Sequence, residues 1–323
     1  MLRRQPPRHA FARAALGLAV VTAMAALVVT RLDEADRVPT ALAPTTTTPS
    51  STTTTAAPTT TAAPTTTVPF DPYALRPPAP AGDSAGLAAQ LLAAETALRD
   101  PATPPPAFAE AALAQQVAYR QLGTHPEWEG TVLAALPQEL HPAVTRHAAA
   151  RREFRAMHAR VSGTLPAWRI VPPAPVEELQ AIYVEAGAAF GVPWQHLAAI
   201  NLVETGMGRI RGTSTAGAQG PMQFLPATWA AYGGGGDINS VHDAIFGAAR
   251  YLAANGGAGD ITNALWNYNH SDHYVLGVQL YADLITEHPN ALRALHLWGV
   301  WYLTTKGDVY LPVGYDAAAP IPV

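Results

Sequence analysis

The sequence lacks cysteine in all of its 323 residues, and Lys306 is its single lysine. The absence of cysteine excludes disulfides, thiol catalysis and thiolate metal sites. The formal net charge at neutral pH is only −4, and outside the extreme N-terminus the basic residues form no cluster of the kind that follows a nucleic acid backbone. We therefore expect no nucleic acid partner.

Acidic residues are also missing from one informative segment. No aspartate or glutamate occurs between Thr205 and Gly236, although the chain holds 24 acidic residues in all. Glu204 stands directly before this segment. A single carboxylate is therefore followed by a long loop that offers it no acidic neighbour.

The N-terminal part predicts export from the cytoplasm. Basic residues 1–13 precede an uncharged run at 14–30, and acidic residues follow it. The run is close to the ~17–25 residues that a membrane-spanning helix needs, and the charge asymmetry places residues 1–13 inside. We interpret residues 14–30 as an uncleaved single-pass anchor in the cell membrane, with the rest of the chain on the extracytoplasmic side. The alternative is a cleaved signal peptide and a secreted protein.

Residues 31–83 are rich in Thr, Pro and Ala and carry few side chains that build a core. We expect this segment to be a disordered linker that holds the later residues away from the membrane.

Residues 84–174 predict a helical accessory region. Leucines recur at helical spacing after Ser84, which is a candidate N-cap, and three further helices are expected near 106–122, from 126 and from about 142. His147 and His158 share a helix face, but a metal site needs more ligands, so we expect none here. The proline-rich connector 163–175 should be extended, with Trp168 and Ile170 holding it down.

The region 175–290 carries the candidate site. A helix is expected at 176–190, and a second one opens at Pro193 and stops at Gly206. Glu204 falls on the apolar face of this second helix, in its last turn. Burial and the negative end of the helix dipole would both raise its pKa, which suits a general acid. The alternative is a surface glutamate at a frayed helix end.

Further expectations concern the segments after Glu204. Pro221 should begin a helix that exposes Met222 and Gln223 in its first turn. Asp237 is expected to cap a helix at 239–254, with Asp243 in its first turns. A helix capped by Ser271 is favoured over a metal site at His270 and His273. Within residues 291–323 we expect a C-terminal β-hairpin that turns at Lys306–Asp308. We expect this aromatic hairpin to pack against the region 175–290, with sugar stacking as the alternative.

Three motifs, Glu204-Thr-Gly, Gly217–Phe224 and Ala264–Asn269, occur in the order seen in lytic transglycosylases. Over residues 176–290, about a third of the chain, the sequence resembles this SLT, goose-lysozyme-like family of bacterial cell-wall lytic enzymes. Pro221 stands where the family commonly has leucine.

The resemblance implies a mainly α fold: a lysozyme-like helical catalytic domain with an N-terminal helical accessory region and a short C-terminal β-hairpin. It implies Glu204 as the single catalytic acid and base, no cofactor and no metal, and peptidoglycan glycan strands as the partner. Tyr268 would bond near Glu204 and orient it. The substrate-binding residues implied are Thr205, Gln219, Met222, Gln223, Tyr268 and Asn269.

The implied reaction cleaves the β-1,4 bond between N-acetylmuramic acid and N-acetylglucosamine and forms a 1,6-anhydro product. Ordinary glycoside hydrolysis uses two carboxylates, at about 5–5.5 Å or about 6.5–9.5 Å. The acid-free loop supplies no second one, and the next in sequence, Asp237 and Asp243, are separated from Glu204 by a further predicted helix. Two alternatives stay open: a goose-type muramidase that hydrolyses the bond, and a non-catalytic peptidoglycan-binding module.

Overall fold

The structure is a computed structural model that describes residues 69–157 and 161–323. The expected anchor at 14–30, nearly all of the expected linker and His158 lie outside these residues. Within the described residues, no helix has both the length and the apolar character needed to cross a membrane. Residues 71–323 belong to one compact unit.

The described part of the chain is mainly helical, as the sequence predicts, with eleven α-helices and three two-stranded sheets. A first group of helices comes from the expected accessory region: α1 (Ser84–Arg99), α2 (Pro105–Thr124), α3 (Glu129–Ala135) and α4 (His141–Ala156). A second group follows: α5 (Val176–Phe190), α6 (Trp194–Thr205), α7 (Pro226–Tyr232), α8 (Val241–Ala254) and α9 (Ile261–Tyr268).

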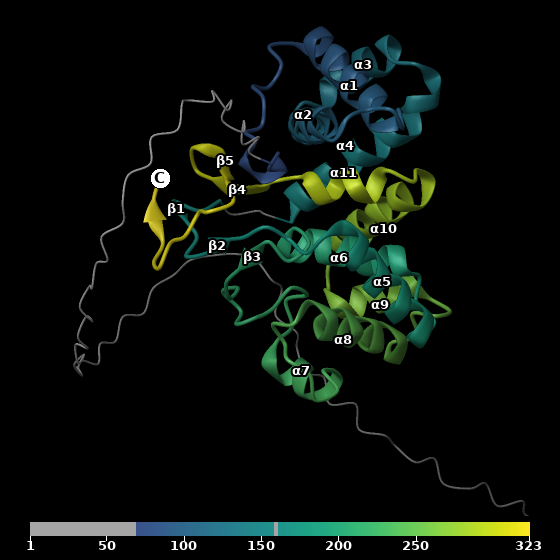
Figure 1. The fold of residues 1–323 in the computed structure, drawn as a ribbon, viewed down its shortest axis with the longest axis vertical. Coiled ribbons are helices and arrows are strands. Elements are labelled where there is room, and N and C mark those ends of the chain that lie inside the picture. Colours follow the sequence, from purple (N-terminus) through teal and green to yellow (C-terminus); the bar gives the residue numbers. More distant parts are fainter. Residues whose placement is uncertain (1–68, 158–160) are drawn as a thin grey trace, which may run out of the picture. The chain divides into compact units, whose positions relative to one another are not determined.

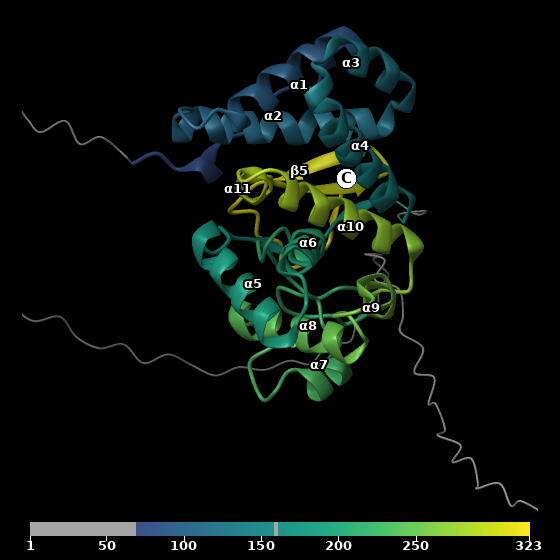
Figure 2. The same cartoon turned by 90° about the vertical axis from the view of Figure 1, so that its right-hand side faces the viewer.

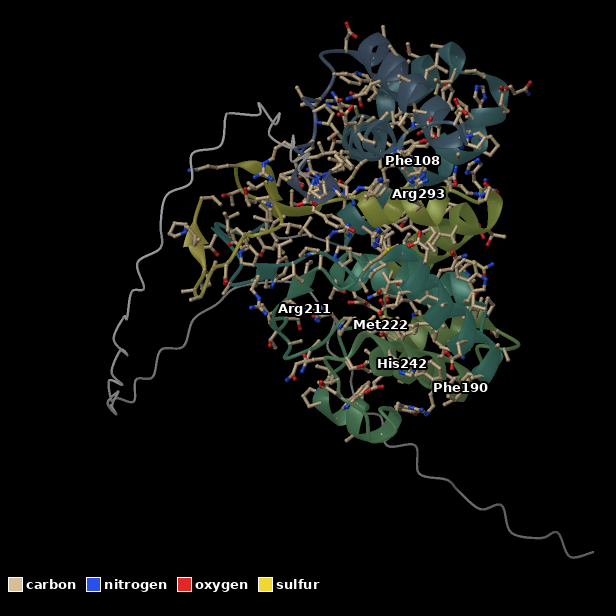
Figure 3. All side chains as sticks on the ribbon, in the orientation of Figure 1. Phe108, Phe190, Arg211, Met222, His242 and Arg293 are labelled. Atoms are coloured by element: carbon tan, nitrogen blue, oxygen red, sulfur yellow. The ribbon has the colours of Figure 1, made fainter. Side chains whose placement is uncertain are left out.

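Helices α10 (Asp272–Glu287) and α11 (Ala291–Leu297) join the two groups. Helix α10 packs against α4 on one side and α6 on the other (Figures 1 and 2). The approach to α4 is close, because a Cβ atom on Gly277 would lie 2.5 Å from the ring of Phe154. Helix α11 contacts α2, where the Arg293 guanidinium lies 4.1 Å from the ring centre of Phe108 (Figure 3). One hydrophobic core therefore runs through both groups.

Most predicted helix ends are confirmed, and two caps are corrected. Helices α5 and α6 end at Gly191 and Gly206, both in the left-handed conformation that glycine adopts readily. Ser271 caps α10 as expected, since its side chain accepts from Tyr274 N. The corrected caps are Asp83 for α1, where Ser84 was expected, and Ser240 for α8, where Asp237 was expected. The Asp237 side chain closes a local turn with Asn239 N instead.

The segment after Gly217 differs from its prediction. Pro221 does not begin a helix; residues 219–224 form a tight turn closed by two 2.9 Å backbone hydrogen bonds between Gln219 and Phe224. Gly220 and Gln223 have φ values of 73° and 50°, which no right-handed helix accepts. Helix α7 starts only at Pro226, because a residue that precedes proline is held in extended backbone.

The strands form three short antiparallel pairs. The C-terminal hairpin is confirmed, with β4 (Val300–Thr304) paired to β5 (Gly307–Leu311). The connector 163–175 is extended as predicted: β2 (Arg169–Ile170) pairs with β3 (Ile210–Arg211), and β1 (Thr164–Leu165) pairs with β6 (Ile321–Pro322). A small second core unites the connector with the hairpin, and its buried members are Ile170, Val300, Tyr302 and Leu311.

The turn at 219–224 yields a test of stability. A Cβ atom at Gly220 would overlap the Ile238 carbonyl oxygen, and the backbone there has positive φ. We expect Gly220→Ala to lower the free energy of unfolding by about 3 kcal/mol or more. Gly217→Ala is the matched control: its φ is also positive, but the space around it is open, so about 1–2 kcal/mol is expected. If urea unfolding showed the two variants to lose equal free energy of unfolding, the proposed clash at Gly220 would be contradicted.

Candidate active site

A pocket of about 290 Å³ lies where the two helix groups meet the hairpin, and Glu204 is among the residues that line it. Its walls come from α2, α4, α6, α10, the connector, the loop after α6 and the hairpin. The volume is at the lower end of the roughly 300–1,000 Å³ typical of ligand pockets. Such a concave surface of mixed polar and apolar side chains, with Glu204 among them, is the arrangement of a candidate active site.

Glu204 is positioned by the end of its helix and by one hydrogen bond. It occupies the last turn of α6, and Gly206 then turns the chain away through backbone hydrogen bonds to Leu202 and from Met207 to Asn201. The Tyr274 hydroxyl donates to Glu204 Oε1 at 2.8 Å. Glu204 as a whole residue is half-buried, and it lines the pocket.

This environment favours the protonated acid. Burial raises the pKa of Glu204 to about 7, because leaving water disfavours the charged form, and the hydrogen bond from Tyr274 opposes part of that rise. The direction is the one that its place on the apolar face of α6 predicts. Near neutral pH the group is therefore present in both forms, so it can donate a proton and accept one back.

The expected partner of Glu204 is corrected. Tyr268 was predicted to bond near Glu204, but its hydroxyl donates to the Met222 carbonyl at 2.6 Å. Tyr274 occupies the place beside Glu204 instead. The two rings lie parallel with centroids 6.3 Å apart. Tyr274 begins the inner face of α10, whereas Tyr268 ends α9 and faces the turn at 219–224. Tyr268 therefore holds the turn, and Tyr274 holds the carboxyl.

The residues of the first two motifs divide between the pocket and the core. Gln223 lines the pocket, but Gln219 does not. Thr205 and Met222, the latter labelled in Figure 3, are fully buried. The Thr205 hydroxyl donates to the Pro221 carbonyl at 2.6 Å. The expected groove contact of Met222 is thus not seen, because the turn points its side chain into the core.

Asn201, which was not predicted as a site residue, reinforces the same junction. It is fully buried, accepts from the Tyr183 hydroxyl at 2.7 Å and donates to the Pro221 carbonyl at 2.8 Å. Together with Thr205 it ties α5, α6 and the turn into one unit. A buried polar side chain of this kind is costly unless all its bonds are made, so it specifies one arrangement of the loop.

Asn269, from the third motif, lines the pocket and is 7% exposed. Its Oδ1 atom is buried and makes no hydrogen bond to the described residues. An acceptor without a partner is unusual in a folded protein. It is consistent with the substrate-binding role predicted for this residue, which stays a prediction.

Several pocket residues were not predicted as site residues. Trp168, Trp301 and Tyr302 form aromatic parts of the wall, and Asp308 brings a second carboxylate. These residues come from the connector and the hairpin, for which the sequence favoured packing, with sugar stacking by the hairpin as the alternative. No short-range pattern links them to Glu204, since the connection exists only in the folded chain.

The second carboxylate is already engaged. Among the described residues that line the pocket, the acids are Glu204 and Asp308. Asp308 forms ion pairs with Arg120 and, at 3.4 Å, with Arg155. Asp237 and Asp243 do not line the pocket; Asp243 Oδ2 accepts from Asp237 N at the start of α8. Glu204 is therefore the pocket acid that has no cationic partner.

Metal ligands are not gathered in the described residues: no group of three or more His, Asp or Glu side chains there is placed to hold an ion. His147 is buried and stacks on Tyr119, with centroids 4.1 Å apart, and His273 pairs with Glu153 at 2.6 Å. Both histidines thus contact other side chains of the fold.

Comparison of the chain with protein families, curated proteins and solved structures found no match. The chemistry of the pocket must therefore carry the functional argument. What it offers is one carboxyl group poised between its two protonation states, beside aromatic and amide side chains.

The raised pKa predicts how stability depends on pH. At pH below ~4 the carboxyl is protonated in both the folded and the unfolded chain, so it contributes nothing. Between about pH 4 and about 7 the unfolded chain loses this proton while the folded protein keeps it, so the free energy of unfolding falls as pH rises. Above about 7 both states are ionised and the loss is complete. We expect Glu204→Gln to be more stable than the native protein by up to about 3 kcal/mol at pH 8–9 and unchanged at pH 4. Chemical unfolding of both proteins at pH 4 and at pH 8–9 measures this. An equal difference in the free energy of unfolding at the two pH values would contradict the prediction.

The two tyrosines provide a matched pair. Tyr274→Phe removes a hydrogen bond that stabilises the Glu204 carboxylate, so the pKa of Glu204 should rise further above about 7. Tyr268→Phe removes a bond to the Met222 carbonyl and should leave that pKa nearly unchanged. Titration of the Glu204 side-chain carbon by NMR distinguishes them. A larger shift in the Tyr268 variant would reverse the assignment.

Proposed function

We propose that the protein is a peptidoglycan lytic transglycosylase with a lysozyme-like helical catalytic domain, and that Glu204 is its single catalytic acid and base. The observation that carries the proposal is the state of this carboxyl group. It lines a pocket, its pKa is raised to about 7, and the other pocket acid is held in ion pairs. The motif order around it is that of the family that the sequence resembles.

The proposed reaction uses one carboxyl group twice. Protonated Glu204 donates its proton to the glycosidic oxygen between N-acetylmuramic acid and N-acetylglucosamine, and the bond from that oxygen to C1 of the muramic acid breaks. The carboxylate then accepts the proton of the 6-hydroxyl of the same muramic acid, whose oxygen bonds to C1. The product is a 1,6-anhydro sugar, the proton returns to Glu204, and no water is consumed.

A pKa near 7 suits both halves of this cycle. A group that donates and then accepts works best when neither form is strongly favoured at the working pH. Tyr274 fits the sequence of steps, because its hydroxyl stays bonded to the carboxyl and stabilises the ionised form that exists between them. A second carboxylate is unnecessary when the substrate supplies its own nucleophile.

The pocket walls suit a glycan strand. Partly exposed Trp168 and Trp301 offer apolar ring faces for sugar rings. Gln223 and Asn269 offer amides near them for hydroxyl and N-acetyl groups. The hairpin was expected to pack, with sugar stacking as the alternative. Val300, Tyr302 and Leu311 fill a small core, and Trp301 lines the pocket, which supports a part for the hairpin in both.

The proposed place of action is the extracytoplasmic side of the cell membrane. This part rests on the sequence of residues 14–30 and on the linker composition of residues 31–83. Peptidoglycan lies on that side, and a long tether would let a membrane-anchored head reach its strands.

Digestion of purified sacculi by the full chain tests the reaction. We expect muropeptides with 1,6-anhydro ends by mass spectrometry, and a rate that falls as pH rises above about 7 because Glu204 loses its proton. Glu204→Gln should lower the rate at least about 100-fold, the usual contribution of a general acid.

Glu185→Gln is the matched control, since Glu185 is exposed on the neighbouring helix α5 and does not line the pocket. It should leave the rate unchanged. Reducing ends in place of anhydro ends would show hydrolysis by a muramidase route. Intact sacculi that nevertheless retain the protein would show a binding module, and either result would overturn the proposed reaction.

A further inference from the structure

The pocket has a strongly basic part that the proposed chemistry does not use. Arg120 from α2 and Arg151 and Arg155 from α4 line it, and of the described lining residues only Asp308 offers these three cations a carboxylate there. The three arginines carry three positive charges and Asp308 one negative charge, so the cluster has a net excess of two positive charges. We call these four residues the basic cluster.

The individual contacts show which cation is left without an anion. Asp308 pairs with Arg120 and with Arg155. Arg120 is further held over the ring of Trp301, 4.8 Å from its centre. Arg151 has no carboxylate within ion-pair distance among the described residues, and its Nε is buried without a hydrogen-bond partner there.

Arg151 is nevertheless firmly placed. Its guanidinium lies close enough to the Tyr281 hydroxyl to act on its pKa: burial raises the pKa of Tyr281, and the positive charge of Arg151 opposes that rise. The base of the side chain is set by close approach of α4 to α2, since a Cβ atom on Gly123 would lie 2.8 Å from Arg151 Cβ. A fixed guanidinium with donors to spare is preorganised for an anion, because little freedom is lost when the anion binds.

Helix α10 gives the distance from the reacting centre. Tyr274 donates a hydrogen bond to Glu204, and Tyr281, seven residues later on the same face, lies beside the Arg151 guanidinium. Seven residues rise about 10 Å along a helix. The basic cluster thus lies about two helical turns along α10 from the catalytic carboxyl, within the same pocket.

We infer that the basic cluster binds a carboxylate of the peptide carried by the muramic acid, so that the enzyme selects peptide-bearing glycan strands. The inference rests on the proposed function, which supplies the strand. Bidentate pairing with carboxylates is the contact for which arginine is best shaped. The peptide branches from the same sugar whose C1 is attacked, so its carboxylates lie near the reacting bond. This gives the accessory helices α2 and α4 a role in specificity.

The test measures binding by the full chain carrying Glu204→Gln, which separates recognition from cleavage. Three strands of equal length are compared: one with peptides, one stripped of peptides by an amidase, and one whose peptide carboxyls are chemically amidated. We expect about tenfold tighter binding of the first than of the other two, as for one charge-assisted hydrogen-bonded pair. Adding Arg151→Gln should reduce that ratio to near one.

Arg152→Gln is the matched control, because Arg152 is the next residue on α4, pairs with Glu129 at 2.8 Å and does not line the pocket. It should keep the tenfold ratio. The use of a ratio removes effects of partial unfolding, and circular dichroism checks the fold. Equal binding of the three strands, or a ratio that Arg151→Gln leaves intact, overturns the inference while sacculus digestion by the native chain still stands. Absence of anhydro products with the ratio intact would instead overturn the proposed reaction alone.

Discussion

The hydrogen bond from Tyr274 to Glu204 is the contact on which the site depends. It joins the end of α6 to the start of α10, and α10 is also the helix against which α4 packs. The bond has two opposed effects on one group. Burial makes the carboxylate costly, and the tyrosine hydroxyl lowers that cost enough for the pKa to rest at about 7.

The same central helix explains why the fold has no separate accessory domain among residues 71–323. Tyr274 and Tyr281 lie on one face of α10, the first hydrogen-bonded to Glu204 and the second beside the guanidinium of Arg151 of α4. The close approach at Gly277 and Phe154 holds these two helices together. The helical region before the connector therefore forms part of the pocket wall, and a change in its packing would alter the geometry of the site.

Local signals in the chain predicted the helices well. Gly191 and Gly206 mark helix ends because glycine accepts the left-handed backbone there, and Ser271 marks a start because its side chain caps a free N–H. The same reasoning failed at Pro221, where positive φ at Gly220 and Gln223 makes a turn. Proline also begins turns, and the nearby Leu225–Pro226 step was the stronger helix signal.

By itself, the sequence determined the mainly helical class, the last-turn place of Glu204 on an apolar face and the absence of acids after it, since these follow from spacing and residue type. The tertiary structure alone decided which tyrosine meets Glu204, that Met222 is buried, and that Asp308 and three arginines share its pocket. The reason is distance along the chain. Tyr274 is separated from Glu204 by 70 residues, and a contact over that span depends on how whole helices pack, which no local pattern encodes.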